Sequence, residues 1–134
     1  MLISKNKLKI LHIASSYWPA FEMGGPIASV YNLNNSLVKK GLNVTVYTTN
    51  AALRDRKDII LKKENNLKGS KVFYFPYFGY IHWTFSPSLF WAARKNIKNF
   101  DLIHITGVWN FPVFAPLSGR DFIKNPILFL RVAR

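Results

Sequence analysis

The stretch Lys9-Ile10-Leu11-His12-Ile13 opens a βαβ unit that extends to Thr49. With Leu8 before it, this short apolar run is typical of a strand buried on both faces of a parallel sheet. Pro26 suits the first turn of the helix that follows, and Gly41 suits its end. The apolar positions expected to form the buried face of this helix are Ile27, Val30, Leu33, Leu37 and Val38.

Further apolar segments extend this unit into a sheet. Ser86-Pro87 is a favourable cap and first turn for a second helix that reaches Asn99. Right-handed crossovers then predict an α/β fold, a Rossmann-like doubly wound parallel sheet with strand order 3-2-1-4-5 along the chain. The third, fourth and fifth strands are expected at 71–76, at 101–106 and from 125–128.

The composition limits the class of protein. A length of 134 residues fits a single domain, 1–134, and the lack of cysteine excludes disulfides and thiolate metal sites. We expect no metal. The segment before Leu8 lacks the pattern of a signal peptide, and no apolar run reaches the length of a membrane span. These features predict a cytoplasmic location.

Basic residues far outnumber acidic ones. The 19 Lys and Arg against 6 Asp and Glu give a formal net charge of +13, so we expect an anionic partner. The clusters are spread along the chain, which leaves open a solvated surface, a contact with an anionic membrane and a nucleic-acid-binding module. The last lacks any recognisable RNP, helix-turn-helix or zinc pattern, so no specific nucleic acid is expected.

Gly24 and Gly25 stand directly before the first expected helix. Two glycines let the backbone approach a ligand, and a helix start offers unpaired N–H groups with partial positive charge, which suits phosphate. The same residues also make an ordinary tight entry into a helix. They are not the dinucleotide fingerprint, because about ten residues separate them from Ile13 and no third glycine is in place.

Two other segments carry open alternatives. Residues 51–70 are expected to form an exposed connection, in which a short helix near 59–65 is one option. Aromatic residues are dense from 73 to 91, and core packing is the favoured account of most of them. Residues 77–85 are too aromatic for a free connection, so a membrane interface or an apolar acceptor is the alternative.

The reversal in strand order predicts a crevice between the first and fourth strands. Ligands of such sheets bind outside the carboxyl ends of the strands, so the loops 14–25 and 106–112 should face each other there. His12 lies inside the first strand and is interpreted as a hydrogen-bonded core histidine.

Several segments, in this order and spacing, resemble the N-terminal domain of family 4 glycosyltransferases of the GT-B fold. The resemblance implies sugar transfer from a nucleotide-sugar co-substrate to a glycan or lipid-linked acceptor, with no other cofactor. It also implies donor-phosphate binding by Gly24 and Gly25. The acceptor side would include Tyr17, Trp18, Glu22, Trp109 and Asn110. The segments are Lys9-Ile10-Leu11-His12-Ile13, Tyr17-Trp18-Pro19, Phe21-Glu22-Met23-Gly24-Gly25-Pro26, Asn43-Val44-Thr45-Val46-Tyr47-Thr48-Thr49, Phe100-Asp101-Leu102-Ile103-His104-Ile105 and Gly107-Val108-Trp109.

The chain departs from the family pattern at the end of the fourth strand. There the resemblance implies His-x-His-Gly, with the second histidine at the mouth of the site. His104 matches the first histidine and Thr106 occupies the position of the second. Threonine exchanges hydrogen bonds but takes up no proton near neutral pH. We expect His104 to lie on the opposite face of the sheet from Thr106, so the catalytic residue stays unknown.

The resemblance covers the first half of a GT-B architecture. Nothing in the chain resembles the family's donor-binding domain with its paired glutamates, so we expect a truncated N-terminal half that is inactive alone. The enzyme is expected to serve cell-envelope or surface polysaccharide synthesis, peripherally on the inner face of the plasma membrane. With suitably chosen codons, the family's usual Leu-Ser-Pro-Arg-Gly-Thr read one base out of frame encodes residues 129–134, which suggests a frameshift. A non-catalytic membrane-surface or nucleic-acid-binding module is the alternative.

Overall fold

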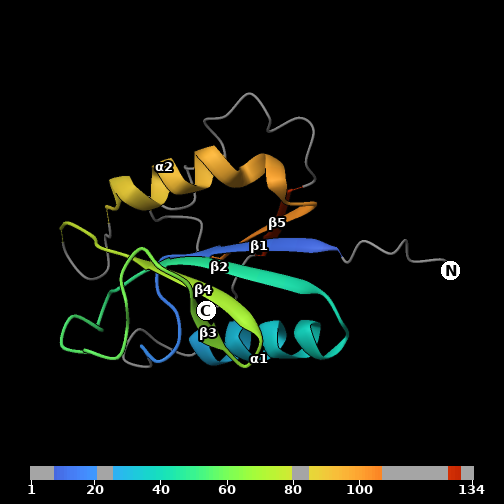
Figure 1. The fold of residues 1–134 in the computed structure, drawn as a ribbon, viewed down its shortest axis with the longest axis horizontal. Coiled ribbons are helices and arrows are strands. Elements are labelled where there is room, and N and C mark those ends of the chain that lie inside the picture. The colour runs from blue at the N-terminus through green and yellow to red at the C-terminus, as the bar shows by residue number, and fades with distance from the viewer. Residues whose placement is uncertain (1–7, 21–25, 80–84, 107–126, 131–134) are drawn as a thin grey trace, which may run out of the picture.

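The computed structural model describes residues 8–20, 26–79, 85–106 and 127–130. Within them the chain forms one twisted sheet with a helix on each face (Figure 1). The strands are β1 (Lys9–Ala14), β2 (Asn43–Thr49), β3 (Asn65–Leu67), β4 (Ser70–Phe75), β5 (Leu102–Thr106) and β6 (Ile127–Leu130). The helices are α1 (Pro26–Lys39), α2 (Pro87–Asn96) and the short 3-10 helix η2 (Ile97–Asn99).

The strand order in the described part of the sheet is β3-β4-β2-β1-β5-β6. The strand β1 pairs in parallel with both β2 and β5, while β2 pairs with β4 and β5 with β6 in the same sense. The five predicted strands correspond to β1, β2, β4, β5 and β6, so the predicted order and the doubly wound topology are confirmed. The point where the order reverses lies between β1 and β5.

The strand β3 corrects the expectation for residues 51–70. This segment contributes an edge strand that pairs antiparallel with β4. A two-residue turn joins the two strands, with left-handed backbone at Lys68 (φ 48°) and Gly69 (φ 92°), as a type I′ hairpin requires. The optional helix does not form in this described segment, where the Asn65 side-chain amide instead donates to the Ile60 carbonyl at 2.9 Å.

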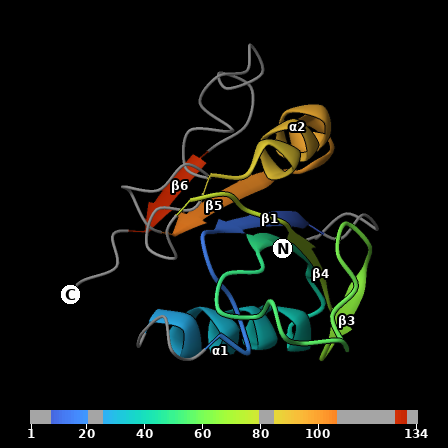
Figure 2. The same cartoon turned by 90° about the vertical axis from the view of Figure 1, so that its left-hand side faces the viewer.

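The two helices lie on opposite faces of the sheet (Figure 2). Each face carries its own apolar cluster under its helix. Because side chains alternate along a strand, β1 directs Leu11 and Ile13 toward α2 and His12 toward α1. The α2-side cluster contains Leu11, Ile13, Tyr47, Phe75, Leu89, Ala93, Ile97, Ile103 and Ile105. The α1-side cluster contains Tyr17, Ala20, Ile27, Val30, Tyr31, Val44, Val46, Leu53, Val72 and Tyr74.

The helix α1 ends as the sequence predicts. Gly41 has φ 88°, a left-handed conformation that favours glycine. Its N–H donates to the Val38 carbonyl at 2.9 Å, and the Leu42 N–H donates to the Leu37 carbonyl at 3.1 Å. These two bonds form a Schellman arrangement that satisfies the last carbonyls of the helix.

The buried face of α1 differs from the predicted one. Leu33 is 38% exposed, whereas Asn34 is fully buried. Leu33 is one position away from the residues of α1 that face the sheet, so its side chain is rotated around the helix axis toward solvent. Leu8 is also exposed, because it precedes the first residue of β1. The α1 residues that face the sheet are Ile27, Val30, Tyr31 and Asn34.

The helix α2 begins at its predicted cap. The Ser86 hydroxyl accepts the Leu89 N–H at 3.3 Å and donates to the Pro76 carbonyl at 2.8 Å. The cap therefore fixes the helix start and ties it to the chain leaving β4. The α-helix ends at Asn96, and η2 carries the helical path to Asn99.

Candidate functional site

The carboxyl ends of β1 and β5 lie side by side at the switch point. Ala14 and Thr106 are partners in the register of these strands. Just past β1, the Ser15 carbonyl accepts a 2.5 Å hydrogen bond from the Thr49 hydroxyl at the end of β2. The same hydroxyl accepts the Ala51 N–H at 3.3 Å. The start of the β1–α1 loop is therefore fastened to the neighbouring strand.

Five predicted site residues, Glu22, Gly24, Gly25, Trp109 and Asn110, lie outside the described residues. Their roles stay predictions. The helix α1 starts at Pro26, the residue that follows the glycine pair in the sequence. The N–H groups and partial positive charge of this helix start are the features on which the predicted phosphate contact depends.

Thr106 is the last residue of β5. Positions 104 and 106 are two residues apart on one strand, so they belong to the same face of the sheet. The expectation that they lie on opposite faces is therefore wrong. The shared face is the α1 face, because His104 contacts His12, while Ile103 and Ile105 pack on the α2 side.

A chain of buried polar groups connects β5, β1, α1 and the loop after β1. His104 Nδ1 lies 3.2 Å from His12 Nδ1, which lies 3.3 Å from Asn34 Oδ1. Asn34 Nδ2 donates to the Tyr17 hydroxyl at 3.0 Å. None of the four side chains is more than 4% exposed. The two strands that border the switch point are thereby linked to one helix.

The donors in this chain can be assigned in order. Asn34 donates through Nδ2 to Tyr17, so its Oδ1 faces His12 and needs a donor. His12 Nδ1 must then carry the proton, and this one N–H is shared by two acceptors, Asn34 Oδ1 and the facing His104 Nδ1. The proton of neutral His104 therefore sits on Nε2, a buried atom for which the structure shows no hydrogen-bond partner.

Burial keeps both histidines neutral at physiological pH. Burial, with a smaller contribution from the neighbouring His104, lowers the pKa of His12 to about 3. Burial also lowers the pKa of His104. An imidazolium at either position would lose its hydration, which disfavours the charged form. The interpretation of His12 as a hydrogen-bonded core histidine is confirmed.

Tyr17 and Trp18, both predicted on the acceptor side, have different environments. Tyr17 is 1% exposed, and burial raises the pKa of its phenol to about 12. Trp18 is partly buried, and its ring stacks on Tyr31 with the centroids 4.3 Å apart. Its carbonyl accepts the Tyr74 hydroxyl at 2.5 Å, and the Trp18-Pro19 peptide is cis. Trp18 presents some surface at this edge, whereas Tyr17 can act only through its neighbours.

Asn34 belongs to this series of buried hydrogen-bonded side chains, and the sequence interpretation did not identify it. It stands seven positions after Ile27, in line with Val30 and Tyr31 on the buried face of α1. A polar residue in such an apolar stripe needs hydrogen-bond partners, and that pattern could have found it.

Neither a metal site nor a membrane span is found in the part of the chain that the structure describes. There, no three His, Cys, Asp or Glu side chains gather in a way that could hold a metal ion. No helix among these residues is long and apolar enough to cross a bilayer.

Comparison with known proteins gives one positive result. The model of glycosyltransferase family 4 matches residues 23–129, which is more than half of the chain. The match includes α1, the strands from β2 to β5 and most of β6. It also covers the loop 106–112 and the last three residues of the loop 14–25. A comparison with curated proteins finds no match.

Proposed function

Since this chain belongs to glycosyltransferase family 4, we propose that it forms the acceptor side of an enzyme that transfers a sugar from a nucleotide-sugar. The proposed acceptor is a glycan or lipid-linked molecule in cell-envelope or surface polysaccharide synthesis. The location proposed for this reaction is the cytoplasm, at the inner face of the plasma membrane. The net charge of +13 supports the proximity to anionic lipid.

The observation that carries the proposal is the geometry of the switch point. Ala14 of β1 and Thr106 of β5 pair at the carboxyl edge, where ligands of doubly wound sheets bind. The glycine pair precedes the α1 start in the sequence, so a diphosphate at this position would receive backbone N–H donors and the positive end of the helix dipole.

In the proposed reaction, this chain binds and orients the acceptor and the diphosphate of the donor. In the proposed transfer, an acceptor hydroxyl oxygen bonds to the anomeric carbon of the sugar while the bond from that carbon to the diphosphate breaks. The leaving diphosphate gains negative charge, which the α1 N-terminus stabilises. The acceptor proton goes to a base that this chain does not supply in the proposal, because His12 and His104 are buried and neutral.

Donor binding in the family belongs mainly to a second domain with paired glutamates, and we extend this division of labour to the present enzyme. The chain alone is proposed to be inactive in sugar transfer. Thr106 would contribute a hydrogen bond at the carboxyl end of β5, without exchanging a proton. Trp18 would contribute a partly exposed ring to the acceptor.

The proposal is tested by titrating the isotope-labelled chain with uridine, guanosine and adenosine diphosphates and following backbone amide shifts by NMR. Saturable shifts are expected at the first residues of α1, and Gly25→Val should abolish them, since a branched side chain blocks the backbone from phosphate. Ser29→Val, at an exposed position further along α1, is the matched control. No saturable shift with any diphosphate, or equal shifts in both variants, would remove the α1 start from the donor site.

A further inference from the structure

Three large aromatic side chains are exposed near the start of α2. Phe78 is 64% exposed, Phe85 49% and Trp91 64%. Phe78 and Phe85 are paired in an antiparallel bridge, in which each N–H donates to the carbonyl of the other at 2.7 and 3.0 Å. Their positions are therefore held by the backbone. Exposed apolar groups held in this way mark an interaction surface more often than chance exposure does.

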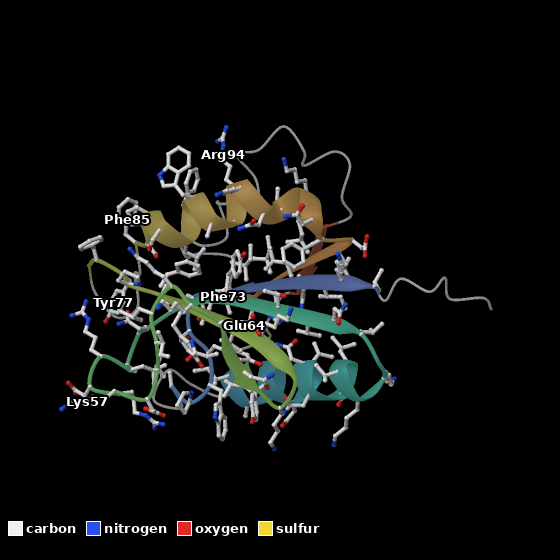
Figure 3. All side chains as sticks on the ribbon, in the orientation of Figure 1. Lys57, Glu64, Phe73, Tyr77, Phe85 and Arg94 are labelled. Atoms are coloured by element: carbon white, nitrogen blue, oxygen red, sulfur yellow. The ribbon has the colours of Figure 1, made fainter. Side chains whose placement is uncertain are left out.

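The outer face of α2 continues this surface with positive charge. Leu89, Ala93 and Ile97 form the buried side of the helix. The exposed residues on the other side recur at i, i+3, i+4 and i+7, so they share one face. Figure 3 shows Arg94 directed outward from α2, and Phe85 at the end where α2 begins. The residues of this outer face are Trp91, Arg94 and Lys95 of α2 and Lys98 of η2.

The charged residues of this helical segment are all basic. From position 87 to position 99 the sequence contains Arg94, Lys95 and Lys98 and no acidic residue. A further cation lies behind the aromatic bridge, where the Arg54 guanidinium stacks over the Tyr77 ring at 4.4 Å. Arg54 also donates to the Tyr77 carbonyl at 3.2 Å, which fixes the chain just before Phe78.

We propose that Phe78, Phe85, Trp91, Arg94, Lys95 and Lys98 form one surface, the aromatic–basic surface, that docks on an anionic lipid bilayer. The aromatic side chains enter the boundary between headgroups and acyl chains, and the basic side chains contact lipid phosphates. A bilayer fits both properties, since apolar rings at one end and cations along the helix match its acyl boundary and its headgroups. Single-stranded nucleic acid would instead need a basic groove along its backbone.

The aromatic–basic surface lies at the edge of the sheet where the acceptor is proposed to bind. The aromatic bridge follows β4, so it lies beyond the carboxyl end of that strand, at the same edge of the sheet as the switch point. A docked chain would therefore hold its proposed acceptor crevice close to the lipid surface, which suits a lipid-linked acceptor. This inference rests on the proposed function for its purpose, but lipid binding needs no sugar transfer, so the two can fail separately.

The test is cosedimentation of the full chain with vesicles of phosphatidylcholine alone and of phosphatidylcholine mixed with phosphatidylglycerol. We expect binding to the anionic vesicles and little to the neutral ones. Arg94→Gln with Lys95→Gln should weaken binding by about five-fold per charge. The control pair Lys39→Gln with Lys40→Gln removes two exposed charges at the end of α1, on the opposite face of the sheet, and should weaken it less.

The aromatic part is tested by Phe85→Ser with Trp91→Ser, which should weaken binding to anionic vesicles about ten-fold. Leu33→Ser, an exposed apolar residue on α1, is the control. Thermal unfolding monitored by circular dichroism shows that each variant is folded, and quenching of tryptophan by brominated lipid, reduced in Trp91→Phe, reports insertion independently.

Three outcomes would overturn the inference. The first is the absence of binding to anionic vesicles. The second is equal loss of binding in the α2 variants and their α1 controls. The third is a concentration-dependent dimer that Trp91→Ser disrupts while vesicle binding is absent, which would assign the surface to a second copy of the chain.

Discussion

His12 Nδ1 and His104 Nδ1 lie 3.2 Å apart at matching positions of the adjacent parallel strands β1 and β5. Two neutral imidazoles can share this contact only when one ring donates and the other accepts. Asn34 decides which, because its carbonyl oxygen requires a proton on His12. The direction of hydrogen bonding at the switch point is therefore set from α1.

This direction predicts the tautomers of both rings. His12 should carry its proton on Nδ1 and His104 on Nε2. Long-range proton–nitrogen correlations of the imidazole rings distinguish the two tautomers directly. A proton on Nδ1 of His104 would contradict the assignment, because it would leave Asn34 Oδ1 without its donor.

The buried pair also predicts how stability depends on pH. Both histidines have lowered pKa values in the folded chain, so below about pH 6.5 the unfolded chain binds these protons more readily than the folded chain does. For His12 this window extends down to its pKa of about 3. The free energy of unfolding should be largest above about pH 6.5 and fall as the pH drops. The contribution of His12 to this fall should approach about 1.4 kcal/mol per pH unit.

Urea unfolding at a series of pH values measures this slope. His104→Gln keeps a polar group against His12 and removes one titrating ring, so its slope should be smaller than that of the natural chain. A stability that stays constant between about pH 7 and about pH 5 would show that the rings are hydrated or charged in the folded chain.

Asn34 should contribute more to the free energy of unfolding than an exposed asparagine on the same helix does. Asn34→Ala removes the hydrogen bond to the buried Tyr17 hydroxyl and one of the two acceptors that face His12 Nδ1. The loss of the Tyr17 partner alone should cost about 1–3 kcal/mol. The matched control is Asn32→Ala, an exposed position on the same helix, which should change the free energy of unfolding by less than about 0.5 kcal/mol. Similar losses in both variants, measured by urea unfolding, would mean that the polar chain is not formed.

The elements predicted from the sequence are those with strong local signals. The strands buried on both faces, the Ser86 cap and the Gly41 end follow from apolar runs and from residues that few other positions favour. The strand order follows from right-handed crossovers. The edge strand β3 could not be predicted in this way, because it is three residues long and becomes a strand only by pairing with β4.

The candidate site could be predicted only in part, because the pairing of its polar side chains depends on the tertiary structure. Sequence spacing predicts which loops meet at the switch point, but not which polar side chains pair beneath them. Asn34 faces His12 because of the angle at which α1 crosses the sheet, which is a tertiary property. Leu33 was predicted to be buried because the sequence does not give this crossing angle.

Gly41 and Gly69 both have left-handed backbone, but of these two only Gly69 has a neighbouring side chain that an added Cβ would strike. Gly41 has φ 88° and open space where a Cβ would stand, so Gly41→Ala should cost only the backbone term of about 1–2 kcal/mol. Gly69 has φ 92°, and a Cβ there would lie 2.6 Å from Val38 Cγ1 of α1. Gly69→Ala should therefore cost the backbone term plus about 1–3 kcal/mol for the overpacked contact.

The crowding part can be isolated with a second substitution. Val38→Ala removes the atom that a Cβ at position 69 would strike, so it should recover part of the loss in Gly69→Ala and none in Gly41→Ala. Chemical unfolding of the two single glycine variants and of the two double variants measures both terms. Equal costs for Gly69→Ala and Gly41→Ala, with no recovery by Val38→Ala, would show that the β3–β4 turn can move away from α1 without loss, and that its packing on the helix contributes nothing to the stability of the sheet edge.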